Sequence, residues 1–324
     1  MTAEAALPSS KVQPGTIATF ITPAPRGCNL SCPFCFIRQR GEDQATTDLK
    51  PKDYVHFIEH IAAAGPLAAV CIQGYEPLLP EAMAYTRAIL ATGRRLRAST
   101  CLVTNGVELA NVVDELAALG VGKIAVSIDA ADAEAHDRQR GRNGAWAAAI
   151  EGIGQAVSTL PVSTELTVTS ILVPKRRHYL EGMPALLKDL GVKCWVVNAL
   201  RKIEPGSSGR PWGDRATILG DMALLQRIAD RHGVDFTVDD EFDTLRYGDP
   251  REDISEVEAL RVRRLERPSG VYRLLPNGQC SIGREILAQV RADTPRWNPR
   301  AMDAGAFIQS LQQRRPEDQS AIET

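Results

Sequence analysis

The stretch Cys28-Asn29-Leu30-Ser31-Cys32-Pro33-Phe34-Cys35 decides how the rest of the chain is interpreted, because it gathers three of the seven cysteines within one short segment. Gly27 precedes it and no regular periodicity runs through it, so we expect a loop. Three thiolates on one loop can bind a single metal centre and leave a coordination position open. In catalytic metal sites, an open position is where the chemistry occurs.

Other interpretations of these cysteines fit less well. Residues 1–10 lack the basic and apolar regions of a signal peptide, so we expect a reducing compartment, where disulfides are rare. Structural zinc commonly takes four ligands from two paired clusters, and no second C-x2-C follows Cys32 and Cys35. The bacterial ferredoxin run has a different spacing, C-x2-C-x2-C-x3-C-P. Spacing alone favours a catalytic cluster, with zinc and an accidental grouping as alternatives.

Length and composition limit the possible folds and partners. The 324 residues are enough for one large α/β barrel or two ordinary domains, and 44% of them are hydrophobic. The formal net charge of −2 gives no electrostatic reason to expect nucleic acid or an anionic membrane as a partner. No apolar run reaches transmembrane length. We therefore expect a soluble, cytoplasmic protein.

Strand-like and helix-like segments alternate along the chain after a loose tail at residues 1–15. This alternation predicts an α/β fold, a partial (β/α)6 TIM-like barrel over residues 16–233. Residues 234–324 show no further clean unit, and we expect them to close the barrel mouth and contribute to substrate binding. The predicted strands are residues 16–22, 67–73, 99–104, 123–128, 165–173 and 193–199. The predicted helices are residues 51–64, 81–91, 109–119, 145–158, 180–190 and 222–231.

The first four predicted strands end in polar or glycine-containing sequences. The cysteine loop follows the first strand, and Gly74-Tyr75-Glu76-Pro77 follows the second. The third ends in Thr104-Asn105-Gly106 and the fourth in Ser127-Ile128-Asp129. Such residues are also ordinary turn formers. Because the carboxyl ends of parallel strands share one rim, where these folds bind ligands, the four exits together favour a functional site.

The cysteine spacing, with Phe34 just before the third cysteine, resembles that of the radical S-adenosylmethionine (radical SAM) enzyme superfamily. The resemblance covers about residues 16–200. It implies one [4Fe–4S] cluster held by Cys28, Cys32 and Cys35, whose fourth iron binds the amino and carboxylate groups of S-adenosylmethionine. It further implies that the reduced cluster cleaves this cofactor to methionine and a 5′-deoxyadenosyl radical, which takes a hydrogen atom from the substrate. An electron donor such as flavodoxin or ferredoxin is implied as a partner.

The resemblance also implies contacts to S-adenosylmethionine. Gly74-Tyr75-Glu76-Pro77 is similar to the family's Gly-Gly-Glu-Pro motif, which holds the methionine amino group, with Tyr75 in place of the second glycine. Arg140 corresponds to an arginine that pairs with the cofactor carboxylate, which suits the forked guanidinium. The other implied contacts are Thr104, Asn105, Ser127, Asp129 and Leu200.

The motifs do not encode the fate of the substrate radical, and the C-terminal region offers only hints. Asp239, Asp240 and Glu241 lie in an acidic run that is either a solvated loop or a site for substrate amino groups. Pro276-Asn277-Gly278 predicts a hairpin just before Cys280. Cys280 stands alone in this region, so we expect no auxiliary cluster. It is either a packed residue or a thiol that donates a hydrogen atom to a substrate radical.

We therefore expect an enzyme that acts on a small polar metabolite, such as a sugar, aminosugar or nucleoside. Epimerisation, dehydrogenation, elimination and decarboxylation all remain open as outcomes. One alternative is a peptide-modifying enzyme that uses a separate recognition partner. A second is a zinc-binding module without enzymatic activity.

One further motif lies on the first predicted helix. His56-Phe57-Ile58-Glu59-His60 matches H-x-x-E-H, the inverted zinc-protease motif. A helix presents the two histidines on one face. The glutamate of that motif has to reach a zinc-bound water at an open mouth, which the outer helix of a barrel does not provide. We expect a solvated helix face here.

Overall fold

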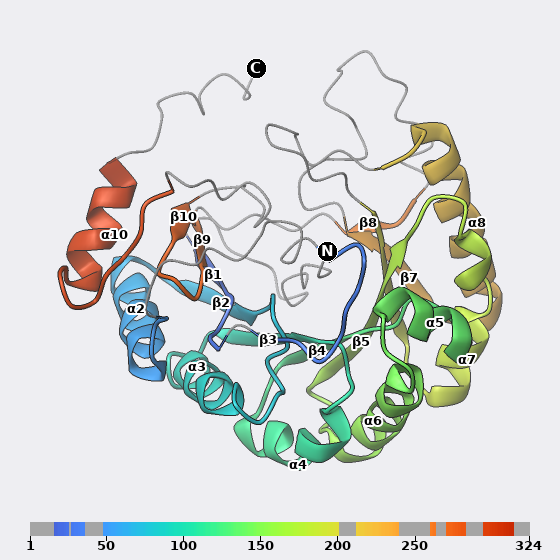
Figure 1. The fold of residues 1–324 in the computed structure, drawn as a ribbon, viewed down its shortest axis with the longest axis horizontal. Helices are drawn as coiled ribbons and strands as arrows, with labels where there is room; N and C mark the ends of the chain where they lie inside the picture. Colours follow the sequence, from blue (N-terminus) through green and yellow to red (C-terminus); the bar gives the residue numbers. More distant parts are fainter. Residues whose placement is uncertain are drawn as a thin grey trace.

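The computed structural model describes residues 16–25, 27–35, 48–200, 212–239, 260–263, 270–282 and 294–313. The strands form one curved sheet, and the helices lie around its outer side (Figure 1). The strands are β1 (Ile17–Ile21), β2 (Leu67–Ile72), β3 (Ser99–Thr104), β4 (Lys123–Ser127), β5 (Glu165–Leu172), β6 (Cys194–Ala199), β7 (Asp235–Asp239), β8 (Val262–Arg263), β9 (Gly270–Leu274) and β10 (Cys280–Ile282). The α-helices are α2 (Pro51–Ala64), α3 (Met83–Arg95), α4 (Leu109–Leu119), α5 (Ala133–Arg140), α6 (Ala145–Thr159), α7 (Met183–Leu190), α8 (Arg215–His232) and α10 (Ala304–Gln313).

The order of the strands confirms the partial barrel. The sheet runs β10-β9-β1-β2-β3-β4-β5-β6-β7-β8, and every neighbouring pair is parallel except β9 with β10. Each of the six predicted strands pairs with the next one along the chain, as successive βα units require. The carboxyl ends of β1 to β6 therefore meet at one edge, where the polar exits were predicted to gather.

The region after residue 233 contributes more to the sheet than the sequence indicated. β7 extends the sheet beyond β6, and β9 pairs with β1 at the opposite edge. The predicted hairpin is confirmed, because β10 turns back antiparallel onto β9 after Gly278. The expectation that residues 234–324 lie outside the repeating units was therefore wrong for these strands. Closure of the barrel mouth by this region stays a prediction, since residues 240–259 and 264–269 lie outside the described residues.

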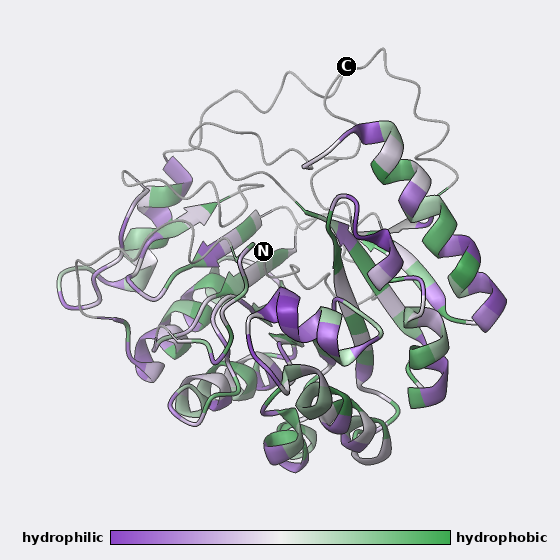
Figure 2. Cartoon of the chain, turned by 45° about the vertical axis from the view of Figure 1, so that its right-hand side comes forward, coloured by the Kyte–Doolittle hydropathy of each residue, from purple (hydrophilic) through white to green (hydrophobic). Residues whose placement is uncertain are grey.

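The helices pack on the sheet through one apolar face each. Helix α2 begins with Pro51, which suits the first turn of a helix. Its buried residues Tyr54, Phe57, Ile58 and Ile61 recur at helical spacing and face the sheet. Figure 2 shows the same division in the other helices, which carry hydrophobic and hydrophilic stripes along their length. The main core thus lies between the sheet and the helix layer.

The inner face of the sheet is lined by a second core of small side chains. Ala18 and Phe20 from β1 contact small residues of the next strands, including Cys71 and Cys101. These two cysteines are buried in strands.

The structure moves the start of one predicted helix, and it adds two α-helices, α5 after β4 and α10 in the C-terminal region. Helix α8 begins at Arg215, about two helical turns before the predicted start at residue 222. Helix α5 was not predicted as a separate element. Among the described residues, none of the helices combines the length and apolarity needed to cross a membrane.

Candidate functional site

The cysteine loop leaves the carboxyl end of β1 and is held by two other elements. The amide of Glu76 donates to the carbonyl of Gly27 (2.9 Å), which ties the loop to the exit of β2. The amide of Ser31 donates to the carbonyl of Arg140 (2.9 Å), which ties it to the end of α5. Close approach at this second point depends on Gly141, whose Cβ, if it had one, would lie 2.6 Å from the carbonyl oxygen of Ser31. The loop is therefore fixed at the rim rather than free in solvent.

The three thiols are unpaired and two of them lie beside hydrogen-bond donors. Cys28, Cys32 and Cys35 are all free cysteines. The side-chain nitrogen Nδ2 of Asn105 is 3.7 Å from Cys28 Sγ, and Arg140 Nη1 is 4.0 Å from Cys32 Sγ. Burial raises the pKa of Cys28 to about 11 and also raises the pKa of Cys32, so both are protonated without a metal. Metal binding would release these protons. Free thiols with nearby donors fit an iron–sulfur cluster, whose sulfurs commonly accept such hydrogen bonds.

Glu76 joins the exits of β2 and β3. Its carboxylate is buried and accepts three hydrogen bonds: from the Leu78 amide (3.1 Å), the Thr104 hydroxyl (2.6 Å) and the Asn105 amide (2.8 Å). Burial outweighs these bonds and raises the pKa of Glu76 to about 7. A buried carboxyl poised near neutrality is well suited to bind a cationic group, whose charge would restore full ionisation.

Asn105 continues this network to the cysteine loop. Its side-chain nitrogen donates to Asn29 Oδ1 (2.7 Å), and its side-chain oxygen accepts from the Val107 amide (2.9 Å). Glu76, Thr104 and Asn105 therefore act as one unit beside Cys28, as expected from the strand exits.

Asp129 and Arg140 form a buried ion pair at the exit of β4. Arg140 Nη2 lies 2.8 Å from Asp129 Oδ2, and both side chains are at most 8% exposed. The other carboxylate oxygen of Asp129 accepts the Ile171 amide (2.9 Å). Asp129 Oδ1 is thus hydrogen-bonded within the protein, whereas Oδ2 makes the ion pair but no hydrogen bond in the described structure. The predicted contacts of Asp129 and Arg140 to S-adenosylmethionine stay predictions, and the geometry adds that Asp129 orients the guanidinium beside Cys32.

Helix α5 supplies two buried polar residues that the sequence analysis did not assign. His136 Nδ1 accepts the Asp129 amide (3.1 Å), and the Gln139 side chain donates to the Asp129 carbonyl (2.9 Å). Burial, with the nearby Arg140, lowers the pKa of His136 to about 3, so the ring is neutral. Residues 136, 139 and 140 share one face of α5, a spacing that could have signalled their joint role.

The remaining predicted cofactor contacts lie along the same rim. Ser127 is buried at the carboxyl end of β4, and Tyr75 is partly buried after β2. Leu200 packs with Phe34 and Ile171 in a small apolar cluster beside Cys32. The Arg140 guanidinium lies 5.9 Å from the centre of the Phe34 ring. The aromatic residue before the third cysteine therefore links the arginine to the apolar cluster.

Two predicted substrate features fare differently. Asp240 and Glu241 lie outside the described residues, and of Asp239 only the backbone in β7 is described, so this acidic site stays a prediction. Cys280 is fully buried in the core between the sheet and the helices, with Leu274 and Trp297. It lies on the outer side of the sheet, away from the barrel interior. The position favours the packed-residue interpretation, and the hydrogen-donor role stays a prediction that this burial does not support.

Comparison with known proteins connects this rim to a family. Residues 22–178 match the family model of the radical SAM superfamily. A stretch of 132 residues is 36% identical to AdoMet-dependent heme synthase of Methanosarcina barkeri, covering 39% of this chain and 35% of the relative. A stretch of 212 residues is 28% identical to probable GTP 3′,8-cyclase of Methanopyrus kandleri, covering 63% of this chain and 64% of the relative. The chain thus spans about a third of the length of the heme synthase and somewhat under two thirds of the length of the cyclase.

The fold is shared with a solved structure. SuiB of Streptococcus suis bound to S-adenosylmethionine superposes with a TM-score of 0.64 at 14% identity, covering 91% of this chain and 65% of SuiB. SuiB has also been solved with its precursor peptide SuiA. At 14% identity, this similarity shows a shared fold and nothing about function. With the matched family model and the cysteine loop at the rim of that barrel, residues 22–178 form a domain of the radical SAM superfamily, whose cofactors are a [4Fe–4S] cluster and S-adenosylmethionine.

Proposed function

We propose that this protein is a radical SAM enzyme that removes a hydrogen atom from a small polar metabolite. Cys28, Cys32 and Cys35 would hold the cluster, which when bound supplies the electron that cleaves S-adenosylmethionine. A flavodoxin or ferredoxin would deliver that electron. Glu76 would bind the cofactor's ammonium group and Arg140 its carboxylate, while Leu200 would contribute an apolar surface next to the adenine. Each of these groups lies on the rim that also carries the cysteine loop.

The observation that carries the substrate class is a set of buried polar side chains on the inner side of the barrel. Gln73, Thr169 and Asn198 alternate with residues of the outer core, so they point to the interior. Both polar atoms of the Gln73 amide, the Thr169 hydroxyl and the Asn198 amide nitrogen are buried without a hydrogen-bond partner in the described structure. Such groups are costly unless something pairs with them. A ligand rich in hydroxyl, amide or ring-nitrogen groups would satisfy them.

A positive charge lies on the same side of the barrel. Arg273 of β9 is 1% exposed, and its guanidinium is 4.5 Å from the centre of the Phe20 ring. GTP, named for the Methanopyrus relative, carries the hydroxyl, amide and ring-nitrogen groups of such a ligand and belongs among the first candidates.

Deuterium transfer tests this substrate class. The anaerobic, reduced protein would be incubated with deuterated nucleotides, sugars and aminosugars, and 5′-deoxyadenosine would be analysed by mass spectrometry. We expect a true substrate to transfer deuterium, and Gln73→Leu to lower that transfer about 10-fold or more because a substrate hydrogen bond is lost. Gln155→Leu on the exposed face of α6 is the matched control and should leave transfer unchanged. Transfer from the SuiA type of substrate, a peptide, with none from the metabolites would instead favour the peptide-modifying alternative.

The pKa of Glu76 predicts how binding of S-adenosylmethionine depends on pH. If only the ionised carboxylate binds the cofactor's ammonium group, a pKa of about 7 makes binding roughly eight-fold weaker at pH 6 than at pH 7.5. Equilibrium binding measured without reductant would show this. Glu76→Gln should bind more weakly and with a flat profile. A flat profile in the wild-type protein would contradict the assigned role.

The same shift has a consequence for the cofactor-free protein. The Glu76 carboxyl loses its proton near pH 4.5 in the unfolded chain and near pH 7 in the folded protein. The folded state therefore binds more protons between these values, and its stability falls as the pH rises through this window. Above this pH window, the contribution of Glu76 to the free energy of unfolding no longer changes with pH.

A further inference from the structure

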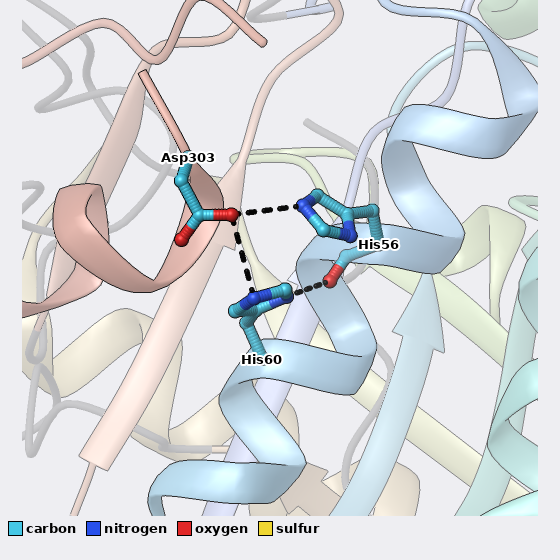
Figure 3. A group of neighbouring side chains, drawn as sticks. All are labelled: His56, His60 and Asp303. Atoms are coloured by element: carbon cyan, nitrogen blue, oxygen red, sulfur yellow. Dashed lines mark hydrogen bonds and ion pairs between the residues drawn. The ribbon is translucent and has the colours of Figure 1, made fainter.

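His56 and His60 meet a third polar side chain that comes from the far end of the chain. Both histidines lie on the exposed side of α2, and Asp303 comes immediately before α10, which packs against α2 (Figures 1 and 3). All three side chains point toward one another in Figure 3. The sequence predicted a solvated helix face here, and exposed fractions of 45% for His56 and 29% for His60 agree with that. Asp303, 247 residues from His56, was not foreseen.

The hydrogen bonds fix which atoms are available to a ligand. His60 Nδ1 lies 2.9 Å from the backbone carbonyl of His56, to which it can only donate. In the neutral ring, His60 Nε2 therefore carries a lone pair and no proton, and this nitrogen lies 3.6 Å from Asp303 Oδ2. His56 Nε2 lies 3.3 Å from the same oxygen. A lone pair and a carboxylate oxygen repel each other unless a proton or a cation lies between them.

The donor set suits a transition metal. Two imidazole nitrogens and one carboxylate oxygen are typical zinc ligands, and an N–H donated to a backbone carbonyl is the usual support for a metal-binding histidine. Ligand atoms about 2.0–2.1 Å from a tetrahedral zinc lie roughly 3.3 Å apart. The three donor atoms here lie within 4.8 Å of one another, and two of their separations are 3.3 and 3.6 Å. Only small side-chain movements would bring all three onto one ion.

The surroundings hold these side chains in place. Asp303 Oδ1 accepts the amides of Gly305 (2.8 Å) and Ala306 (3.3 Å) at the start of α10, which leaves Oδ2 for the histidines. The His56 ring stacks on buried Trp297, with ring centres 6.3 Å apart. A Cβ at position 305 would lie 3.0 Å from the His60 ring, so glycine makes room for the imidazole.

Glu59 takes no part in this group. Its carboxylate pairs with Arg95 on α3 at 2.6 Å, so the glutamate of the H-x-x-E-H motif faces a neighbouring helix instead of the histidines. The arrangement therefore lacks the general base of a zinc protease.

We propose that His56, His60 and Asp303 form a site for a divalent transition metal, with zinc as the probe, that fastens α10 to α2. Water would complete the coordination, because the group lies at the surface. The metal would join the C-terminal helix to the first helix of the barrel. It is separate from the cysteine loop and does not depend on the proposed reaction.

Zinc content of the full-length protein tests the site. The cluster-loaded chain would be dialysed anaerobically against zinc sulfate and then zinc-free buffer, and metals counted by mass spectrometry. We expect one zinc per chain, retained in the Cys28→Ala/Cys32→Ala/Cys35→Ala variant, which removes the other candidate ligands. His60→Gln and Asp303→Asn should each weaken zinc binding at least about 100-fold, since even second-shell changes cost about 10–100-fold. Glu59→Gln is the matched control and should bind zinc normally.

Folding is controlled by the choice of variants and by a second measurement. Asparagine caps a helix about as well as aspartate, so Asp303→Asn keeps the start of α10 while removing the charged ligand. Zinc should slow amide hydrogen exchange in α10 of the wild-type protein and leave it unchanged in Asp303→Asn. Absence of retained zinc, loss of zinc with the three cysteines, or unchanged affinity in both ligand variants would each overturn the proposal.

Discussion

Replacing Cys32 by Ala should reduce the iron of the anaerobically reconstituted protein from about four per chain to a small residual fraction. The proposed cluster has only three protein ligands, all on one loop, so the loss of one leaves two thiolates to hold it. Cys32 is also the thiol next to Arg140, and its replacement removes the sulfur that this guanidinium contacts. Iron analysis and the visible absorbance of the cluster would measure the effect. We expect the rate of S-adenosylmethionine cleavage to fall by about 1,000-fold or more, because the electron that cleaves the cofactor comes from this cluster.

Cys194→Ala is the matched control for that experiment. Cys194 is a partly buried cysteine at the start of β6, far along the strand from the rim at its carboxyl end. Its replacement should leave both iron content and cofactor cleavage near the wild-type level. If Cys32→Ala kept its full iron while Cys194→Ala lost it, the assignment of the cluster to residues 28–35 would be wrong.

Asp129→Asn should destabilise the cofactor-free protein by about 3–5 kcal/mol, the usual effect of leaving a buried charge without its partner. The Arg140 guanidinium is buried, and its ion pair with Asp129 is 2.8 Å long. An asparagine can still accept the Ile171 amide but cannot neutralise the arginine. Urea-induced unfolding, followed by circular dichroism, would give the difference in the free energy of unfolding. The loss should be smaller with S-adenosylmethionine bound, if the cofactor carboxylate pairs with Arg140.

Asp132→Asn is a suitable comparison three residues away. Asp132 caps α5 by accepting the Ala135 amide (2.8 Å), and asparagine caps helices equally well. This variant should change the stability by less than about 0.5 kcal/mol. Equal, small effects of both substitutions would show that the pair at the β4 exit is not a buried ion pair in solution.

The parts of the fold that the sequence predicted are those with an apolar pattern of their own. β2 to β6 are mostly buried along their length and rich in apolar and β-branched residues. The α2, α4 and α6 helices carry apolar residues at helical spacing. The strands beyond β6 do not have such a signal. β8 has only two residues, and β7 begins and ends in aspartate. Their pairing depends on neighbours from elsewhere in the sheet, which no local pattern records.

Helix α5 was missed for a related reason. The residues it buries include His136, Gln139 and Arg140, which are polar, so a search for apolar periodicity passes over it. Asp129 pairs with all three through its backbone or its carboxylate. One other polar atom of each side chain is buried without a hydrogen-bond partner in the described structure. Likewise, the proximity of Asp303 to His56 and His60 follows from the packing of α10 on α2 and from nothing near either segment in the sequence.

The strand exits were predictable because parallel topology brings them to one edge whatever the sequence between them. That rule placed Glu76, Thr104 and Asn105 together, and the hydrogen bonds confirm their contact. It could not show that Asp129 and Arg140 pair with each other, since Arg140 belongs to a helix rather than to a strand exit.

Reductive cleavage of S-adenosylmethionine tests the central claim most directly. The protein would be purified without oxygen, its cluster reduced with dithionite, and methionine and 5′-deoxyadenosine quantified by mass spectrometry after addition of the cofactor. We predict a brown protein that forms the two products in equal amounts, only when reduced and only when Cys28, Cys32 and Cys35 are all present. A colourless protein that holds zinc at these cysteines and forms neither product would contradict the account.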